Sequence, residues 1–305
     1  MKIKIDTQRP NLDMKKHIIN SRKDRMRSYA SIFSSSTFAR VIQHEDFDFI
    51  NKKIERYDFP ELGKSFFTYS DYLRYTYKHL KKEYRCEYIY KNELINELLL
   101  KKYGTKNTIV INEFKVGNSV ADMVLFNGTS KAFEIKTELD SEKRLSGQLN
   151  DYIRVFKECY IVTHESLIDK YIDKNENTGI IAFAKHGNSL KMQEIKSAII
   201  NDKIDADILI RSLRTQEYRN IISQYFGELP GVSNFKMFDA CLSLMKQIPE
   251  NELNNLFIIE LKKRVSNTQL LHSFNYELRQ LCLSLKINTK CYEELNLKLS
   301  QPIKL

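Results

Sequence analysis

The chain has 305 residues, of which 42% are hydrophobic and 29% charged, a composition typical of a water-soluble globular protein with room for more than one domain. No apolar run approaches the roughly 18–20 residues that a membrane span needs, and no signal segment follows the basic N-terminus. We therefore expect a cytoplasmic protein without a membrane partner. Five cysteines without a C-x-x-C motif argue against a disulfide framework and a thiolate zinc site.

Positive charge is in excess and is unevenly distributed. Lys and Arg number 49 against 39 Asp and Glu, giving a net charge of +10 and a pI near 9.1, which favours a polyanionic partner. Residues 1–89 carry 19 basic and 12 acidic side chains, residues 90–188 carry 14 of each, and residues 189–305 carry 16 and 13. The excess therefore lies outside the middle third.

The first 89 residues lack strand alternation and are predicted to be helical, with breaks at Ser34–Ser36 and Pro60–Gly63. After the second break, Thr68, Ser70 or Asp71 can cap a helix that continues to Tyr84. Tyrosines and lysines are interleaved along this helix. The pattern suits stacking on nucleic acid, but a helix that buries tyrosines on one face and solvates lysines on the other explains it sufficiently.

The middle third predicts an α/β domain, and the sequence after it predicts a return to helices. The expected elements of the middle third are a helix over Tyr90–Lys102, strands over Thr108–Val116, Ser119–Phe126 and Lys131–Thr137, an amphipathic helix with the stripe Leu145, Leu149, Tyr152 and Phe156, a strand over Cys159–Thr163, and a hairpin of Gly179–Ala184 with Ser189–Met192. We thus expect a mixed central sheet flanked by helices at residues 90–200, between helical regions at 1–89 and 201–305.

Candidate catalytic residues lie on two of these strands. Five acid-x-Lys tripeptides occur in the chain, but only Glu134-Ile135-Lys136 lies in an apolar strand that pairs, through a short turn, with another apolar strand bearing an acid, Asp122. Glu134 and Lys136 share a face because strand residues two apart point the same way. A three-residue loop, Asn127-Gly128-Thr129, places Asp122 opposite Glu134. A two-residue Asn-Gly loop would send the two carboxylates to different faces.

Two adjacent carboxylates between apolar strand residues repel each other, and a divalent cation resolves that conflict. Mg²⁺ or Mn²⁺ accepts such oxygen ligands and keeps positions open for water and substrate phosphate. A lysine beside the metal can orient the attacking water and stabilise the transition state. Asp122, Glu134 and Lys136 therefore indicate phosphodiester hydrolysis, with a fortuitous acid pair neutralised by neighbouring lysines as the competing interpretation.

These residues, in a helix-strand-strand-strand-helix-strand order, resemble the PD-(D/E)XK (restriction-endonuclease-like) nuclease superfamily, in a bacterial or phage branch. Glu93 corresponds to the acid that many members carry on the first core helix, and Gln148 with Tyr152 resembles the Q-x-x-x-Y element of the RecB-type branch. The resemblance covers about residues 88–200. Ala121 precedes Asp122 where the full signature has proline.

The resemblance implies a magnesium-dependent endo- or exonuclease that binds DNA. Asp122 and Glu134 would ligate Mg²⁺ with the backbone carbonyl of Ile135, Lys136 would position the water, and Glu93 would bind or orient the metal through water. Gln148 would steady the site or touch the substrate, and Tyr152, on the apolar stripe, is expected in the core. The alternative is a non-catalytic nucleic-acid-binding or protein-interaction module with the same fold. The oligomeric state stays open, and a dimer is compatible with the pattern.

Overall fold

The computed structural model describes residues 12–173, 176–186 and 189–305. The chain forms two compact units, one containing the residues up to Cys86 together with Lys290–Leu305, and the other containing Glu87–Thr289. The predicted boundary after residue 89 lies close to the observed one. The predicted region 201–305 is divided instead, because the buried side chains of its last helix, including Leu295 and Leu299, pack in the unit of the N-terminal helices.

The first unit is helical, as predicted. Its elements are α1 (Leu12–Ile32), α2 (Ser35–His44), α3 (Asp48–Lys53), η1 (Ile54–Asp58), η2 (Phe59–Glu61), α4 (Tyr69–Glu83) and α13 (Thr289–Leu299). Ser34 caps α2 at the first predicted break. Thr68 caps α4, where its hydroxyl accepts from the Asp71 N–H and the Asp71 carboxylate accepts in return from the Thr68 N–H.

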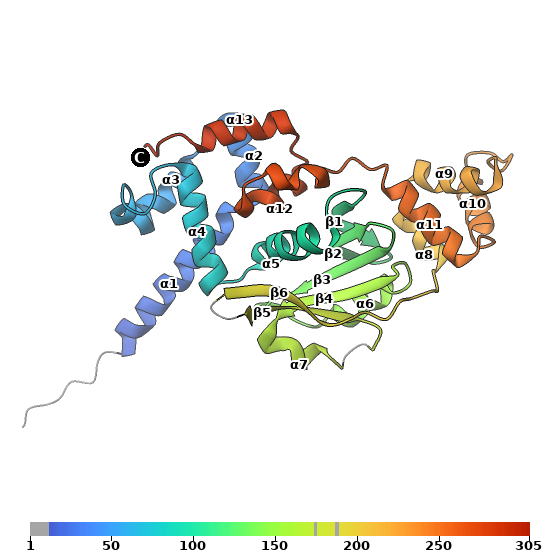
Figure 1. The fold of residues 1–305 in the computed structure, drawn as a ribbon, viewed down its shortest axis with the longest axis horizontal. Helices are drawn as coiled ribbons and strands as arrows, with labels where there is room; N and C mark the ends of the chain where they lie inside the picture. Colours follow the sequence, from blue (N-terminus) through green and yellow to red (C-terminus); the bar gives the residue numbers. More distant parts are fainter. Residues whose placement is uncertain (1–11, 174–175, 187–188) are drawn as a thin grey trace, which may run out of the picture. The chain divides into compact units, whose positions relative to one another are not determined.

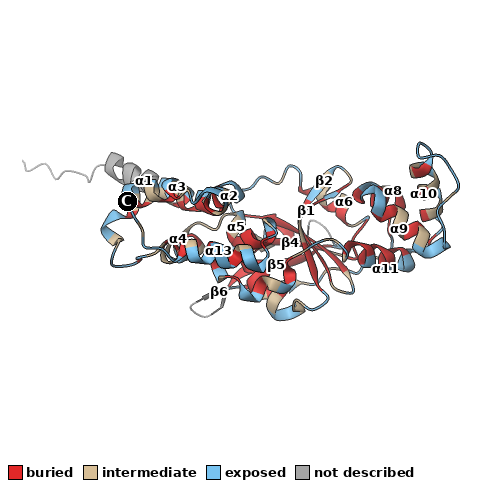
Figure 2. Ribbon diagram, turned by 90° about the horizontal axis from the view of Figure 1, so that it is seen from above, coloured by how far each residue is buried: buried red, intermediate tan, exposed pale blue. Residues whose placement is uncertain are grey.

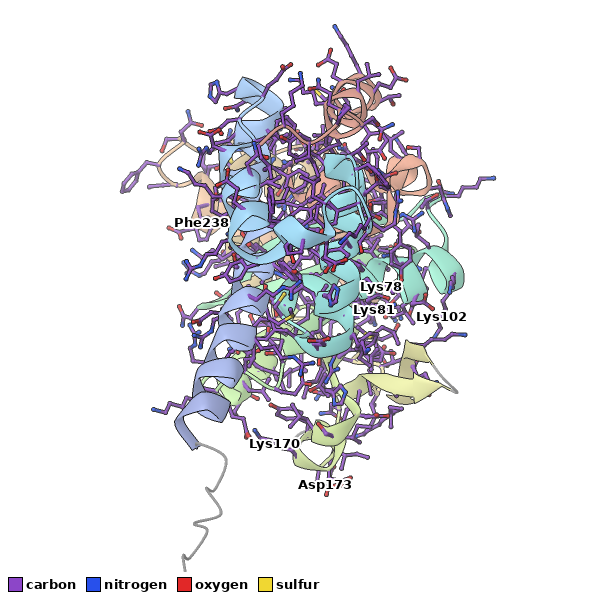
Figure 3. The ribbon with its side chains drawn as sticks, turned by 90° about the vertical axis from the view of Figure 1, so that its left-hand side faces the viewer. Lys78, Lys81, Lys102, Lys170, Asp173 and Phe238 are labelled. Atoms are coloured by element: carbon purple, nitrogen blue, oxygen red, sulfur yellow. The ribbon has the colours of Figure 1, made fainter. Side chains whose placement is uncertain are left out.

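Helix α4 buries tyrosines on one face and exposes lysines on the other, which is the simpler of its two predicted interpretations. Tyr72 and Tyr77 are buried, whereas Lys78 is exposed and Lys81 half-buried on the other side (Figure 3). An amphipathic helix buries its rings to form a core, and buried rings cannot stack on bases. The interleaved tyrosines and lysines are therefore explained by packing.

A buried carboxylate joins three elements of this unit. Asp58 is fully buried and accepts hydrogen bonds from Tyr29 Oη at 2.7 Å and Tyr72 Oη at 2.8 Å, and it pairs with Arg25. Burial and the Asp58 charge raise the pKa of both tyrosines above the usual range. A buried carboxylate needs several charge-assisted donors, and this one has them.

We expect Asp58→Asn to lower the free energy of unfolding by about 1–2 kcal/mol, because the amide loses the charge that holds Arg25 and both hydroxyls. Urea unfolding at pH 7 measures the change. Asp24→Asn is the control, since Asp24 is exposed and lies 3.9 Å from Arg27, and it should change stability by less than about 0.5 kcal/mol. Equal losses in the two variants would contradict a special role for Asp58.

The second unit is mixed α/β and contains a six-stranded sheet in the order β1 to β6 (Figure 1). Its strands are β1 (Ile109–Val116), β2 (Ser119–Phe126), β3 (Ser130–Lys136), β4 (Glu158–His164), β5 (Gly179–His186) and β6 (Ser189–Lys196). Neighbours pair antiparallel from β1 to β3, parallel from β3 to β5, and antiparallel again between β5 and β6. All six strands were predicted, with small differences at their ends.

Helices flank this sheet. They are α5 (Glu87–Glu93), the π-helix η3 (Leu94–Tyr103), α6 (Leu145–Tyr152), η4 (Glu165–Leu167), α7 (Ile168–Tyr171), α8 (Ala206–Ser212), α9 (Thr215–Phe226), α10 (Met237–Met245), α11 (Glu250–Leu261), η5 (Thr268–Ser273), η6 (Tyr276–Leu278) and α12 (Arg279–Ser284). Leu229–Gly231 separates α9 from α10, and Pro249 separates α10 from α11. The stripe residue Phe156 is buried but lies beyond the end of α6.

The two faces of the sheet pack against different helices. Ala132 of β3 belongs to one apolar cluster with Leu145 and Leu149 of α6, so the even-numbered residues of β3 face α6. The neighbouring Lys131 lies with its Nζ 5.5 Å from the ring of Tyr103, so the odd-numbered residues face η3. Figure 2 shows the central strands buried between these layers. Both faces are covered, so all seven residues of β3 are buried, and β2 ends in the buried apolar run Met123–Phe126.

Two predictions concern absences. No helix in the described part of the chain is long and apolar enough to cross a membrane. All five cysteines are free thiols, as their spacing predicted. Burial in apolar surroundings raises the pKa of the Cys159 and Cys282 thiols, so neither is a reactive thiolate.

Candidate active site

The β2–β3 hairpin has the register on which the candidate site depends. Phe126 pairs with Ser130, so the loop contains three residues, Asn127 to Thr129, with Gly128 at a φ of 116°. Continued along the strands, this register puts Asp122 directly across from Glu134. Of the two loop lengths that the sequence allowed, the structure has the three-residue one, and the two carboxylates come from adjacent strands at the same level.

The two strands stop pairing just before that level. The last backbone pair is Met123 with Phe133, and beyond it the Asp122 Oδ2 atom accepts a hydrogen bond from the Ile135 N–H at 2.7 Å. A side chain therefore occupies the place of the next ladder bond. The opening leaves the Asp122 carboxylate next to the peptide group that follows Glu134.

Glu134 is held by donors on two sides. Its side chain is only 2% exposed; Lys136 Nζ lies 2.8 Å from Oε1, and Tyr152 Oη lies 2.7 Å from Oε2. The Tyr152 hydroxyl also lies 2.8 Å from the Val120 carbonyl, and because it carries one proton the two acceptors compete for it. Burial and the Glu134 charge raise the pKa of Tyr152 above its usual range, so it stays a donor.

Helix α6 brings two more side chains to this cluster. Gln148 and Tyr152 lie one turn apart on the same face, and Gln148 Oε1 accepts from Lys136 Nζ at 3.2 Å. Asp151 fixes the helix on the β1–β2 turn, where its carboxylate accepts from the Asn118 N–H and from Ser119 Oγ. Gly117 has a φ of 57° there, and its Cβ position lies 3.1 Å from Asp151, so the turn requires glycine.

Tyr152 is both a core residue and a site residue. Its ring is fully buried on the apolar stripe, as predicted, and its hydroxyl reaches Glu134. The sequence pattern showed the stripe but not the reach of the phenol. The spacing of Gln148 and Tyr152 was the signal that could have shown this contact, because residues four apart on a helix lie on the same face.

Lys91 is a site residue that the sequence analysis missed. It lies on α5, is 6% exposed, and places its Nζ 3.7 Å from Asp122 Oδ1 and 2.5 Å from Glu87 Oε1. The nearby carboxylates raise its pKa, so it is an ammonium ion. Its i, i+4 spacing from Glu87 looks like an ordinary surface pair. Only the position of α5 on the sheet shows that Lys91 is buried beside Asp122.

The surroundings of Asp122 favour the protonated form of its carboxyl group. Burial, followed by the negative charge of Glu134, raises the pKa of Asp122 to about 6, although Lys91 and the Ile135 N–H act in the opposite direction. Two carboxylates held this close disfavour the doubly ionised form. The pair therefore provides a strong electrostatic attraction for a cation.

Glu93 lies two positions after Lys91 on α5, and it contacts Tyr276. It is fully buried, and its Oε2 atom accepts from Tyr276 Oη at 2.7 Å. The charge of Glu87, the first residue of the same helix, also raises the pKa of Asp122. Glu87 and Glu93 lie six positions apart, so they project from different sides of the helix. The role of Glu93 beside the metal stays a prediction.

The donor set suits a metal that keeps much of its own water. Within residues 12–173, 176–186 and 189–305, no three Asp, Glu, His or Cys side chains gather as a metal cage. Asp122 and Glu134 are two carboxylates, and Ile135, whose N–H faces Asp122, directs its carbonyl to the same edge of β3. Mg²⁺ is commonly held by one or two carboxylates, with waters and substrate phosphates completing the shell. The residues present fit that requirement.

Comparison with known proteins identifies a family that covers this site. The family model described as bacteriophage P4 protein cII matches residues 80–283, about two thirds of the chain. Protein cII of Enterobacteria phage P4 is 27% identical over 177 residues, which cover 56% of this chain and 65% of that relative. The chain thus spans just under two thirds of the relative's length.

One solved structure is also similar in part. A protein of unknown function from Silicibacter pomeroyi aligns over 47% of this chain and 92% of its own, with a TM-score of 0.30 and 11% identity.

Proposed function

This chain belongs to the bacteriophage P4 protein cII family, and we propose that it is a metal-dependent nuclease with a PD-(D/E)XK core that hydrolyses phosphodiester bonds of DNA. The observation that carries the proposal is the arrangement of Asp122 and Glu134 across the opened β2–β3 ladder, with Lys136 2.8 Å from Glu134. The order α5, β1, β2, β3, α6, β4 supports it.

Each side chain has a role in the proposed reaction. Asp122 and Glu134, with the Ile135 carbonyl, would hold Mg²⁺ or Mn²⁺, which supplies Lewis-acid polarisation of the phosphate and a more acidic bound water. Lys136 is positioned by Glu134 and Gln148 and would orient the attacking water by hydrogen bonding. Its charge also opposes the negative charge that develops on the phosphate oxygens.

Tyr152 positions Glu134 without touching substrate. We expect Tyr152→Phe to weaken Mn²⁺ binding and cleavage about 10- to 100-fold, since losing a hydrogen bond to a metal ligand has effects of that size. Isothermal titration with Mn²⁺ and initial cleavage rates measure the two losses. Tyr160→Phe is the matched control, because Tyr160 Oη lies 3.0 Å from Glu158 outside the site. Equal losses in both variants would show a general effect on folding.

The proposed function is tested by incubating the full chain with linear, circular, branched and single-stranded DNA, and with RNA, in Mg²⁺ or Mn²⁺. Cleavage should stop with EDTA and resume when metal is restored. Asp122→Ala and Lys136→Ala, purified in parallel, should be inactive. Equal residual cleavage by all three proteins would identify a contaminating nuclease and contradict the proposal. The panel also separates endonuclease from exonuclease activity and DNA from RNA.

A second candidate function is a non-catalytic nucleic-acid-binding module that retains the fold. The observation that favours it is the pairing of each site carboxylate with a lysine, Asp122 with Lys91 and Glu134 with Lys136. Internal cations of this kind could neutralise the acids permanently. Mn²⁺ titration separates the two functions, because a permanently neutralised pair would bind no metal in the presence of DNA.

A further inference from the structure

A basic cleft runs along β1, the free edge strand of the sheet. It has a volume of about 560 Å³ and lies between the α8–α9 junction and the end of α12. Cationic side chains line it from three segments: Lys115 on β1, Arg211 and Arg214 around α8, and Lys286 after α12. All four residues are exposed. Because one unit contains the whole cleft, its lining is a property of that unit.

The charges of the cleft are poorly balanced by acids. Arg264, deeper in the cleft, is neutralised by Glu217, whose oxygens lie 2.6 and 2.7 Å from its guanidinium nitrogens. One of these oxygens also lies 4.0 Å from Nε of Arg214, whose side chain is 70% exposed. Glu113 is the only acid among the residues that line the cleft, all of which are described. Four cations therefore face solvent around a concave surface, an arrangement that attracts a polyanion.

A second hollow extends the cleft toward the start of β1. It has a volume of about 410 Å³, shares Arg264, Val265 and Ser266 with the first, and adds Lys262. The eight residues of β1 extend for about 26 Å. An elongated row of cations matches successive phosphates of a polymer better than it matches a single small anion.

The cleft leads to the carboxylate pair. Asn112 pairs with Met123 and Phe114 pairs with Ala121, so Glu113 lies across from Asp122 on the neighbouring strand. The Glu113 charge also acts on Lys91, the partner of Asp122. A chain lying along the β1 edge would thus pass beside the residues proposed to cleave it.

We propose that this cleft binds the sugar-phosphate backbone of a nucleic-acid strand and guides it to Asp122 and Glu134. The binding rests on the geometry of the cleft, and the guidance rests on the proposed nuclease function. Lys115, Arg211, Arg214 and Lys286 contact phosphates, and such contacts carry affinity without sequence preference.

Binding is measured by fluorescence anisotropy with the full chain, a labelled 20-nucleotide strand and its duplex, in EDTA so that no cleavage occurs. Arg211→Gln/Arg214→Gln should weaken binding about tenfold at 100 mM KCl and should reduce the salt slope by about one to two. Lys115→Gln/Lys286→Gln should do the same, which guards against a fold defect in either variant.

The matched control is Lys191→Gln/Lys203→Gln, which removes the same charge from exposed lysines, one of them on β6 at the opposite edge of the sheet. It should keep wild-type affinity. Equal weakening in the control, or no weakening in the cleft variants, would overturn the proposal. So would equally tight competition by poly-glutamate, which would indicate a site for acidic polypeptides. If the cleft variants weaken binding but the wild type cleaves nothing with metal, the cleft stands and the nuclease function fails.

Discussion

Glu134→Gln should reduce cleavage about 10³-fold or more and should abolish measurable Mn²⁺ binding, because the amide removes one of the two anionic ligands. The change keeps the size of the side chain, and the amide oxygen can still accept from one of the two donors, Lys136 or Tyr152. The fold should therefore survive. Single-turnover cleavage rates and Mn²⁺ titration, with circular dichroism as the check on folding, measure the effect.

The chain contains its own control for this substitution. Glu194-Ile195-Lys196 on β6 repeats the tripeptide Glu134-Ile135-Lys136, but Glu194 pairs with Lys102 and Lys196 donates to the Ile172 carbonyl. Glu194→Gln should leave cleavage and metal binding within about twofold of the wild type. Equal losses in the two variants would mean that the tripeptide supports folding and does not define a catalytic site.

Asp122→Asn should abolish activity and yet stabilise the metal-free protein at neutral pH. The folded state raises the pKa of Asp122 from 3.8 to about 6, so ionising this carboxyl is harder in the folded chain than in the unfolded one. Below about pH 4 the Asp122 carboxyl is protonated in both states, so it does not change the free energy of unfolding with pH. The free energy of unfolding falls as the pH rises from there through about 6. The variant should gain about 2–3 kcal/mol at pH 7.5 relative to its effect at pH 4.

Urea unfolding in EDTA at the two pH values measures this linkage. Asp205→Asn is the control of opposite sign, because hydrogen bonding to Arg154 and to the first amides of α8 lowers the pKa of Asp205. That variant should lose similar stability at both pH values, because a carboxyl with a lowered pKa is still ionised in the folded chain at pH 4 and its contribution is lost only at lower pH. An Asp122→Asn variant with the same stability difference at both pH values would contradict the assigned burial of the carboxylate pair.

Much of the candidate site followed from local sequence. Alternation and turn residues predicted β2 and β3, and the spacing of two residues between Glu134 and Lys136 placed them on one face. The hairpin loop was the decisive local feature, since three residues from Asn127 to Thr129 set Asp122 across from Glu134. Strand periodicity depends on neighbouring residues alone, so a single sequence contains it, whereas the choice between a two- and a three-residue loop was made only in the structure.

Other features depended on how distant segments pack. Lys91 and Glu93 lie two positions apart on one helix, and only the docking of α5 decides that the lysine reaches Asp122 while the acid meets Tyr276. The cleft gathers cations from residues 115, 211, 214 and 286, which no periodicity connects. The sequence by itself determined the strands and their acidic residues, and it reduced the register of the β2–β3 hairpin to two alternatives. The tertiary structure decided that register and the partners of the carboxylate pair, because contacts between distant segments arise from packing and leave no local pattern.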